Sequence, residues 1–189
     1  MTLTKSIVRI ALATGFFLLI PLVAMQFTTE VTWTLSDFVV AGVLLFGTGL
    51  TYALVARKGS TTVYRVAVGV AVATGLLLIW VNLAVGFIGS ENNPANLLYG
   101  GVLAVGIIGA IIAGFQPRGM ANAMFAAALV QFLVPLVAAA IWKPEVNAGM
   151  MQVLALNTVF AMIWVGSGLL FRRASAPGSP ANRQLAQQV

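Results

Sequence analysis

The densest group of polar side chains in the sequence lies within residues 80–99, W-V-N-L-A-V-G-F-I-G-S-E-N-N-P-A-N-L-L-Y. Carboxylates attract cations, whereas asparagine amides offer both donors and acceptors to neutral polar groups. We therefore expect this segment, on the outer side of the membrane, to bind or transport a small solute, a cation or a lipid headgroup. The predicted ligand-binding residues, with the indole of the tryptophan as an apolar wall, are Asp37, Trp80, Asn82, Glu91 and Asn96.

Further polar residues lie inside long apolar segments. Thr48 and Tyr52 follow Asp37 at helical spacing, so an acid, a hydroxyl and a phenol share one helix face and outline a pathway. Gln131 and Asn157 lie at depth in two other apolar segments, where lipid offers an amide no partner. We assign Thr48, Tyr52, Gln131 and Asn157 to the pathway hypothesis.

Most of these residues also have a structural interpretation. Asn93 before Pro94 is typical of a helix N-cap and first turn, and Thr34 with Asp37 forms a similar capping signal. Threonine and tyrosine in membrane helices often bond to their own backbone or lie in the headgroup belt. Buried amides commonly join neighbouring helices, a bond worth roughly 1 kcal/mol. Capping leaves the combination of Asn82, Glu91 and Asn96 unexplained.

The composition argues against most enzyme chemistry. The chain has no cysteine and no histidine, which excludes disulfides, thiolate or imidazole metal sites and Ser-His-Asp triads. Its four acids all fall near predicted helix boundaries. We therefore predict a protein that is not an enzyme, with no catalytic residue, no bound metal and no cofactor.

The same composition predicts a membrane protein. Hydrophobic residues make up 60% of the chain and charged residues 7%, too few charges to cover the surface of a soluble domain. Six apolar runs are each long enough to cross about 30 Å of hydrocarbon as a helix, and none alternates as a barrel strand would. The predicted fold is an all-α bundle of six transmembrane helices at residues 7–25, 37–56, 66–88, 95–115, 120–142 and 150–171.

The basic residues predict orientation rather than nucleic-acid binding. They lie at the ends of apolar runs without interleaved aromatics, and nine of the ten fall on one side, with Lys143 on the other. Both termini are therefore expected in the cytoplasm. A shift of 59 residues lays Asp37 onto Asn96 and aligns several glycines, which suggests three helical hairpins related by an internal repeat.

The two ends of the chain call for separate interpretations. Lys5 and Arg9 followed by an apolar run resemble a signal peptide, but cleavage after Ala24 would put Leu22 where a small residue is needed, so we expect the first helix to be retained. Residues 174–189 are rich in proline, serine and glutamine and are predicted to be a disordered cytoplasmic tail. The transmembrane domain is thus expected to span residues 1–173.

Small residues recur at helical spacing in the third and fourth predicted helices. These are Gly75, Asn82, Gly86 and Gly89 in one, and Gly106, Ala110 and Gly114 in the other. Such faces favour close helix packing within the bundle. An alternative function, a structural or accessory subunit of a larger complex, predicts that the faces point outward. The expected partners are the lipid bilayer and, left open by the sequence, further copies or a membrane complex.

In residues 80–99, together with G-G-V-L-A-V-G-I-I-G and F-Q-P-R-G-M after them, the chain resembles a family of small multi-pass proteins of the bacterial inner membrane. The likeness covers most of residues 15–173. It implies a bacterial cytoplasmic membrane and assigns no catalytic or binding residue.

Overall fold

The computed structural model describes residues 3–142 and 148–176, and within them it is helical and contains no strand. Six of its helices are long and apolar enough to cross a membrane, which confirms the predicted all-α fold. The chain is an integral membrane protein. The helices are α1 (Leu3–Phe27), α2 (Leu35–Val55), α3 (Thr62–Ala84), α4 (Tyr99–Ile112), α5 (Pro117–Trp142) and α6 (Ala148–Ala174), with short 3₁₀ helices η1 (Ala56–Lys58) and η2 (Pro94–Leu98).

The chain divides into two compact units, Met1–Leu54 (unit 1) and Val55–Val189 (unit 2), which we describe separately. One transmembrane domain over 1–173, three hairpins and two cytoplasmic termini stay predictions. The predicted tail at 174–189 lies largely outside the described residues, as does Lys143.

Unit 1 consists of α1 and α2. Helix α1 has no buried residue, and in α2 the buried residue is Ala41. Thr34 and Asp37 cap the start of α2 as predicted, because the Asp37 carboxylate accepts hydrogen bonds from the Thr34 N–H and Oγ1, both at 2.7 Å.

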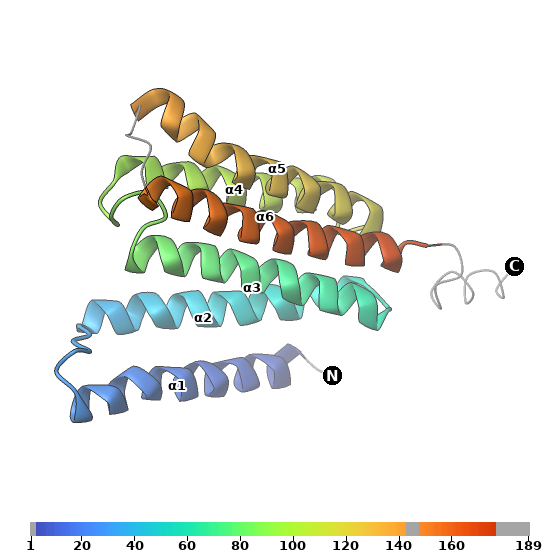
Figure 1. Ribbon diagram of the computed structural model, residues 1–189. Coiled ribbons are helices and arrows are strands. Elements are labelled where there is room, and N and C mark those ends of the chain that lie inside the picture. Colours follow the sequence, from blue (N-terminus) through green and yellow to red (C-terminus); the bar gives the residue numbers. More distant parts are fainter. Residues whose placement is uncertain (1–2, 143–147, 177–189) are drawn as a thin grey trace, which may run out of the picture. The chain divides into compact units, whose positions relative to one another are not determined.

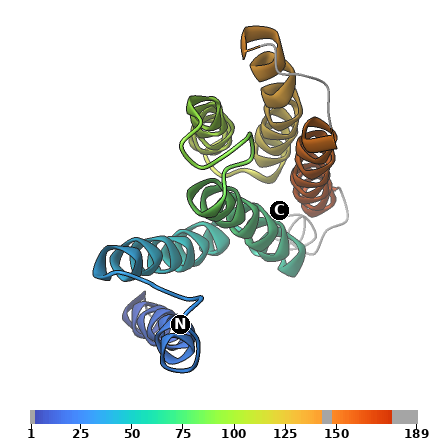
Figure 2. The same ribbon diagram turned by 60° about the vertical axis from the view of Figure 1, so that its left-hand side comes forward.

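Unit 2 is a bundle of four long helices. Helix α5 packs against α4 and α6, and α3 packs against α6 (Figures 1 and 2). A Cβ added at Gly109 would lie 2.7 Å from the Cβ of Ala123, so α4 approaches α5 closely at this glycine. Gly106 is also buried, with Met124 of α5 beside it. Of the predicted small-residue face of α4, Gly106 therefore packs inside the bundle, whereas Gly114 is exposed.

Two predicted helices end earlier than expected. Helix α3 stops at Ala84, because Gly86 and Gly89 have φ of +71° and +72°, a left-handed conformation that glycine tolerates. The predicted helical stripe through Gly86 and Gly89 is therefore wrong. Helix α4 ends at Ile112, and Gly114 (φ +54°) belongs to the following turn. At the other end, the Asn93 side chain accepts from Ala95 N–H as predicted, but the first turn is 3₁₀.

Candidate functional site

The loop between α3 and η2 is folded around the side chain of Asn96. Its Oδ1 accepts hydrogen bonds from the N–H groups of Phe87 (3.0 Å) and Ile88 (2.9 Å). Its Nδ2 donates to the carbonyls of Ile88 (3.3 Å) and Ser90 (2.7 Å). Both acceptor positions and both donors are thus used by the loop. The structure gives Asn96 a scaffold position, and its proposed contact with a ligand stays a prediction.

Gly86 fits closely into this arrangement. A Cβ at this position would lie 2.5 Å from the Ser90 carbonyl oxygen and 2.6 Å from Asn96 Nδ2. Together with its positive φ, this contact requires glycine. Asn96 and Gly86 therefore shape the backbone of this loop, and a ligand-binding role for the loop stays a prediction.

Asn82, Glu91 and Asp37 form the following hydrogen bonds with residues near them in the sequence. Asn82 donates from Nδ2 to the Leu78 carbonyl of its own helix at 2.8 Å, and its buried Oδ1 has no hydrogen-bond partner among the described residues. Trp80 lies half-buried on α3. Glu91 is exposed and accepts from Asn92 at 3.2 Å. Asp37 is occupied in the α2 cap, within unit 1. Their shared binding role stays a prediction.

The predicted pathway residues divide between the two units. Thr48 and Tyr52 lie on α2 in unit 1. Gln131 and Asn157 belong to unit 2, where they form a buried hydrogen bond of 2.9 Å between Gln131 Nε2 and Asn157 Oδ1. Tyr99 of α4 donates its hydroxyl to the same Oδ1 at 3.0 Å. Three helices are therefore joined at one amide oxygen, as the structural interpretation of these amides predicts.

One hydrogen-bond acceptor in this cluster, Gln131 Oε1, has no partner among the described residues. Asn157 Nδ2 donates to the Val153 carbonyl at 2.8 Å, which fixes the amide so that its oxygen faces Gln131 and Tyr99. Gln131 must then present Nε2 to Asn157, and its Oε1 is buried with no hydrogen-bond partner among the described residues. Pro135, four residues later, has no N–H for the Gln131 carbonyl. The middle of α5 therefore has acceptors in excess.

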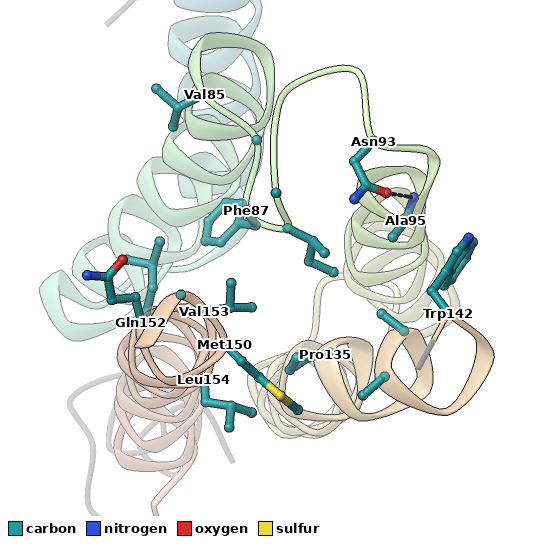
Figure 3. A pocket seen from close by; sticks show the side chains of 17 residues that line it. Val85, Phe87, Asn93, Ala95, Pro135, Trp142, Met150, Gln152, Val153 and Leu154 are labelled. Carbon is teal, nitrogen blue, oxygen red and sulfur yellow. Dashed lines mark hydrogen bonds between the residues drawn. The ribbon is translucent and has the colours of Figure 1, made fainter. Parts of the chain in front are cut away.

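A cavity of about 620 Å³ opens one helical turn away from this cluster. Its walls come from the α3–η2 loop, the C-terminal part of α5 and the first turns of α6 (Figure 3). Pro135 and Val153, each four residues from a cluster amide on its own helix, both line it. In Figure 3 the side chains of Phe87, Val153 and Met150 face this space. No charged residue lines it among the described residues.

The shape of the cavity follows from α5. Proline inside a helix removes a hydrogen bond and bends the axis, and the C-terminal part of α5 turns away from α6 in Figure 1. The opened space lies beside the Asn96 loop, which supplies Phe87 and Ile88 to its wall. Polar groups are few: the described polar side chains that line it are Asn93 and Gln152.

Most of the lining residues carry no signal in the sequence. Ala138, Ala139, Met150 and Leu154 are apolar residues within apolar helices, and nothing in their spacing separates a cavity wall from a lipid-facing surface. Pro135 was the available clue, since proline inside a helix bends its axis. Asn82 does not line this cavity, and the wall of the cavity is mainly apolar.

No protein-family model, curated protein or solved structure matches the chain.

Proposed function

We propose that the protein binds a lipid-like, amphipathic molecule whose apolar part enters the cavity beside the Asn96 loop. The observation that carries this proposal is the cavity itself: about 620 Å³, mainly aliphatic and aromatic in lining, within a preformed loop and helix framework. Ligand sites in proteins commonly enclose about 300–1,000 Å³ and place a few polar groups in an apolar wall. Asn93 and Gln152 supply such groups here.

The chemistry of the wall favours this ligand class over a cation. A cation at membrane depth needs carboxylates or several converging oxygens, whereas the described lining has no acid and two amide side chains. A small polar solute would leave most of the apolar wall without matching contacts. An acyl chain or another apolar group matches it, with a polar head near Asn93.

The location of the protein is part of the same proposal: a bacterial cytoplasmic membrane. The basic ends of the helices and the resemblance to small bacterial membrane proteins support a bacterial cytoplasmic membrane with both termini inside. In this orientation the cavity belongs to the outer half of the membrane, because it lies at the Trp142 end of α5, opposite Arg118. The protein acts as a binding or transfer protein and not as an enzyme.

An accessory-subunit role is less well supported. It predicts outward small-residue faces, but Gly106 of the face on α4 is buried beside Met124 of α5. A face used inside the bundle is not free for another protein.

Photocrosslinking tests the proposal directly. The purified protein is reconstituted with a phosphatidylcholine that carries a diazirine in its acyl chain, and labelled peptides are mapped by mass spectrometry. We expect labelling concentrated in 135–142 and 149–156. Ala139→Phe, which fills the cavity from its half-buried wall, should reduce this labelling several-fold.

Ala140→Phe is the matched control, because Ala140 lies one position further on the same helix, is exposed and does not line the cavity. It should leave the labelling pattern unchanged. Equal labelling of all lipid-facing helices, with no difference between the two variants, would exclude a lipid site in this cavity.

A further inference from the structure

A second cavity, of about 420 Å³, lies at the other end of unit 2, where α5 begins and α6 ends. Its lining is polar and basic: Arg118 and Asn122 from α5, and Arg172, Ser175 and Ala176 from α6 and the turn after it. We propose that this cavity binds the phosphate group of an anionic phospholipid. The site is separate from the apolar cavity, which lies at the Trp142 end of α5.

The two arginines come from different helices of the bundle, Arg118 from α5 and Arg172 from α6. The guanidinium of Arg172 lies over the ring of Phe125 on α5, with 4.9 Å between its Cζ and the ring centroid. Ser175 Oγ donates to the Arg172 carbonyl at 2.7 Å and holds the end of α6. Arg118 and Asn122 are four residues apart, so they lie on one face of the first turns of α5. The cavity is thus lined from both helices.

The local electrostatics favour an anion. Of the acids in unit 2, Glu91 lies in the α3–η2 loop at the opposite end, and Glu145 lies outside the described residues. No described carboxylate of unit 2 therefore neutralises Arg118 and Arg172. The first N–H groups of α5 add positive potential at the same end. Guanidinium groups match phosphate oxygens in geometry and can bind them bidentately.

The position of the cavity favours a lipid as the source of the phosphate. It lies at the ends of two helices that cross the membrane, and Leu169 and Val165, one and two turns before Arg172 and Arg173, are exposed apolar residues along α6. Acyl chains can lie along this surface while the phosphate occupies the cavity. Basic pockets between helix ends are a common way to hold anionic headgroups.

Native mass spectrometry of the full chain in neutral detergent tests the inference, with phosphatidylglycerol and phosphatidylcholine titrated separately. We expect phosphatidylglycerol to bind more tightly. Arg118→Gln and Arg172→Gln should each weaken its binding roughly tenfold, the effect of losing a charge-assisted hydrogen bond. Phosphatidylcholine binding should not change.

Arg173→Gln is the matched control, since it removes the same charge from the adjacent position, which does not line the cavity. It should change phosphatidylglycerol binding less than twofold. Circular dichroism checks that each variant is folded. If a glutamine variant does not fold, Arg172→Lys replaces it in the test. This variant keeps the charge but loses the bidentate geometry, so it should still weaken phosphatidylglycerol binding.

Three outcomes would overturn the inference. An equal loss in Arg173→Gln would mean nonspecific attraction to a basic surface. Equal binding of the two lipids would exclude selection for an anionic headgroup. Displacement of phosphatidylglycerol by millimolar inorganic phosphate would assign the site to a soluble anion instead of a lipid.

Discussion

The two units are built from equally apolar helices but pair their polar side chains over different distances. In unit 1 the side chains of Thr28, Thr34 and Asp37 bond to residues two or three positions away. In unit 2 the Tyr99 hydroxyl reaches Asn157, 58 positions later, and Ser167 reaches the Ala67 carbonyl, 100 positions earlier. The hydrogen bonds of Thr28, Thr34 and Asp37 thus shape local turns in unit 1, whereas those of Tyr99 and Ser167 join separate helices in unit 2.

This difference explains why the candidate sites belong to unit 2. A cavity in a membrane protein persists only where the surrounding helices cannot collapse into it, and the Tyr99–Asn157–Gln131 cluster holds three of them together next to the apolar cavity. Helix α1, with no buried residue, contributes no comparable framework. The long-range polar contacts and the two candidate sites therefore occur in the same unit of this molecule.

The largest expected effect comes from the loop. Asn96→Ala removes the acceptor for the Phe87 and Ile88 N–H groups and the donors to Ile88 and Ser90, and should lower the free energy of unfolding by about 3 kcal/mol. Equilibrium unfolding by SDS in mixed micelles, followed by circular dichroism, measures it. Asn92→Ala, at an exposed residue of the same loop, should change stability by less than about 0.5 kcal/mol. Similar values for both would show that Asn96 does not organise the loop.

Glycine-to-alanine substitutions should affect stability differently in the two units. Gly109→Ala should destabilise unit 2 by about 2 kcal/mol, since the new Cβ would meet Ala123, whose short side chain cannot move aside. Gly47→Ala in unit 1 should change stability by less than about 1 kcal/mol, because no described atom lies within 4 Å of the added Cβ and alanine favours the helix. The same SDS titration compares them. A loss at Gly47 as large as the loss at Gly109 would contradict the explanation by close helix contact.

Substitutions of the two buried amides, Asn157 and Gln131, should lower the free energy of unfolding by different amounts. These losses should be the smallest of the three predicted effects. Asn157→Leu leaves the Tyr99 hydroxyl and Gln131 Nε2 without their acceptor and should cost about 1–2 kcal/mol. Gln131→Leu also removes an unpaired Oε1, and Asn157 keeps the Tyr99 hydroxyl, so the change should stay below about 0.5 kcal/mol. Equal losses in the SDS titration would mean that Gln131 Oε1 has a partner, such as an ordered water.

The sequence predicted the capping groups well and the helix ends less well. Thr34 with Asp37 and Asn93 with Pro94 were recognised because caps act within a few residues. The end of α3 was missed, since Gly86 and Gly89 fit an apolar helical stripe by spacing and their positive φ arises from the contacts of the Asn96 loop. Local chemistry is visible in the sequence, whereas a loop held by a residue ten positions away is not.

By itself, the sequence determined that the chain is an integral membrane protein of long apolar helices and that its amides at depth need partners, because lipid supplies no hydrogen bonds. Only the tertiary structure decided which partners these amides have. It also decided that an apolar cavity lies beside Pro135 and that a basic cavity lies beside Arg118 and Arg172. The physical reason is that hydropathy is a property of each residue, while a cavity depends on how helices far apart in the sequence bend and pack. An alanine on a cavity wall and an alanine facing lipid have the same side chain.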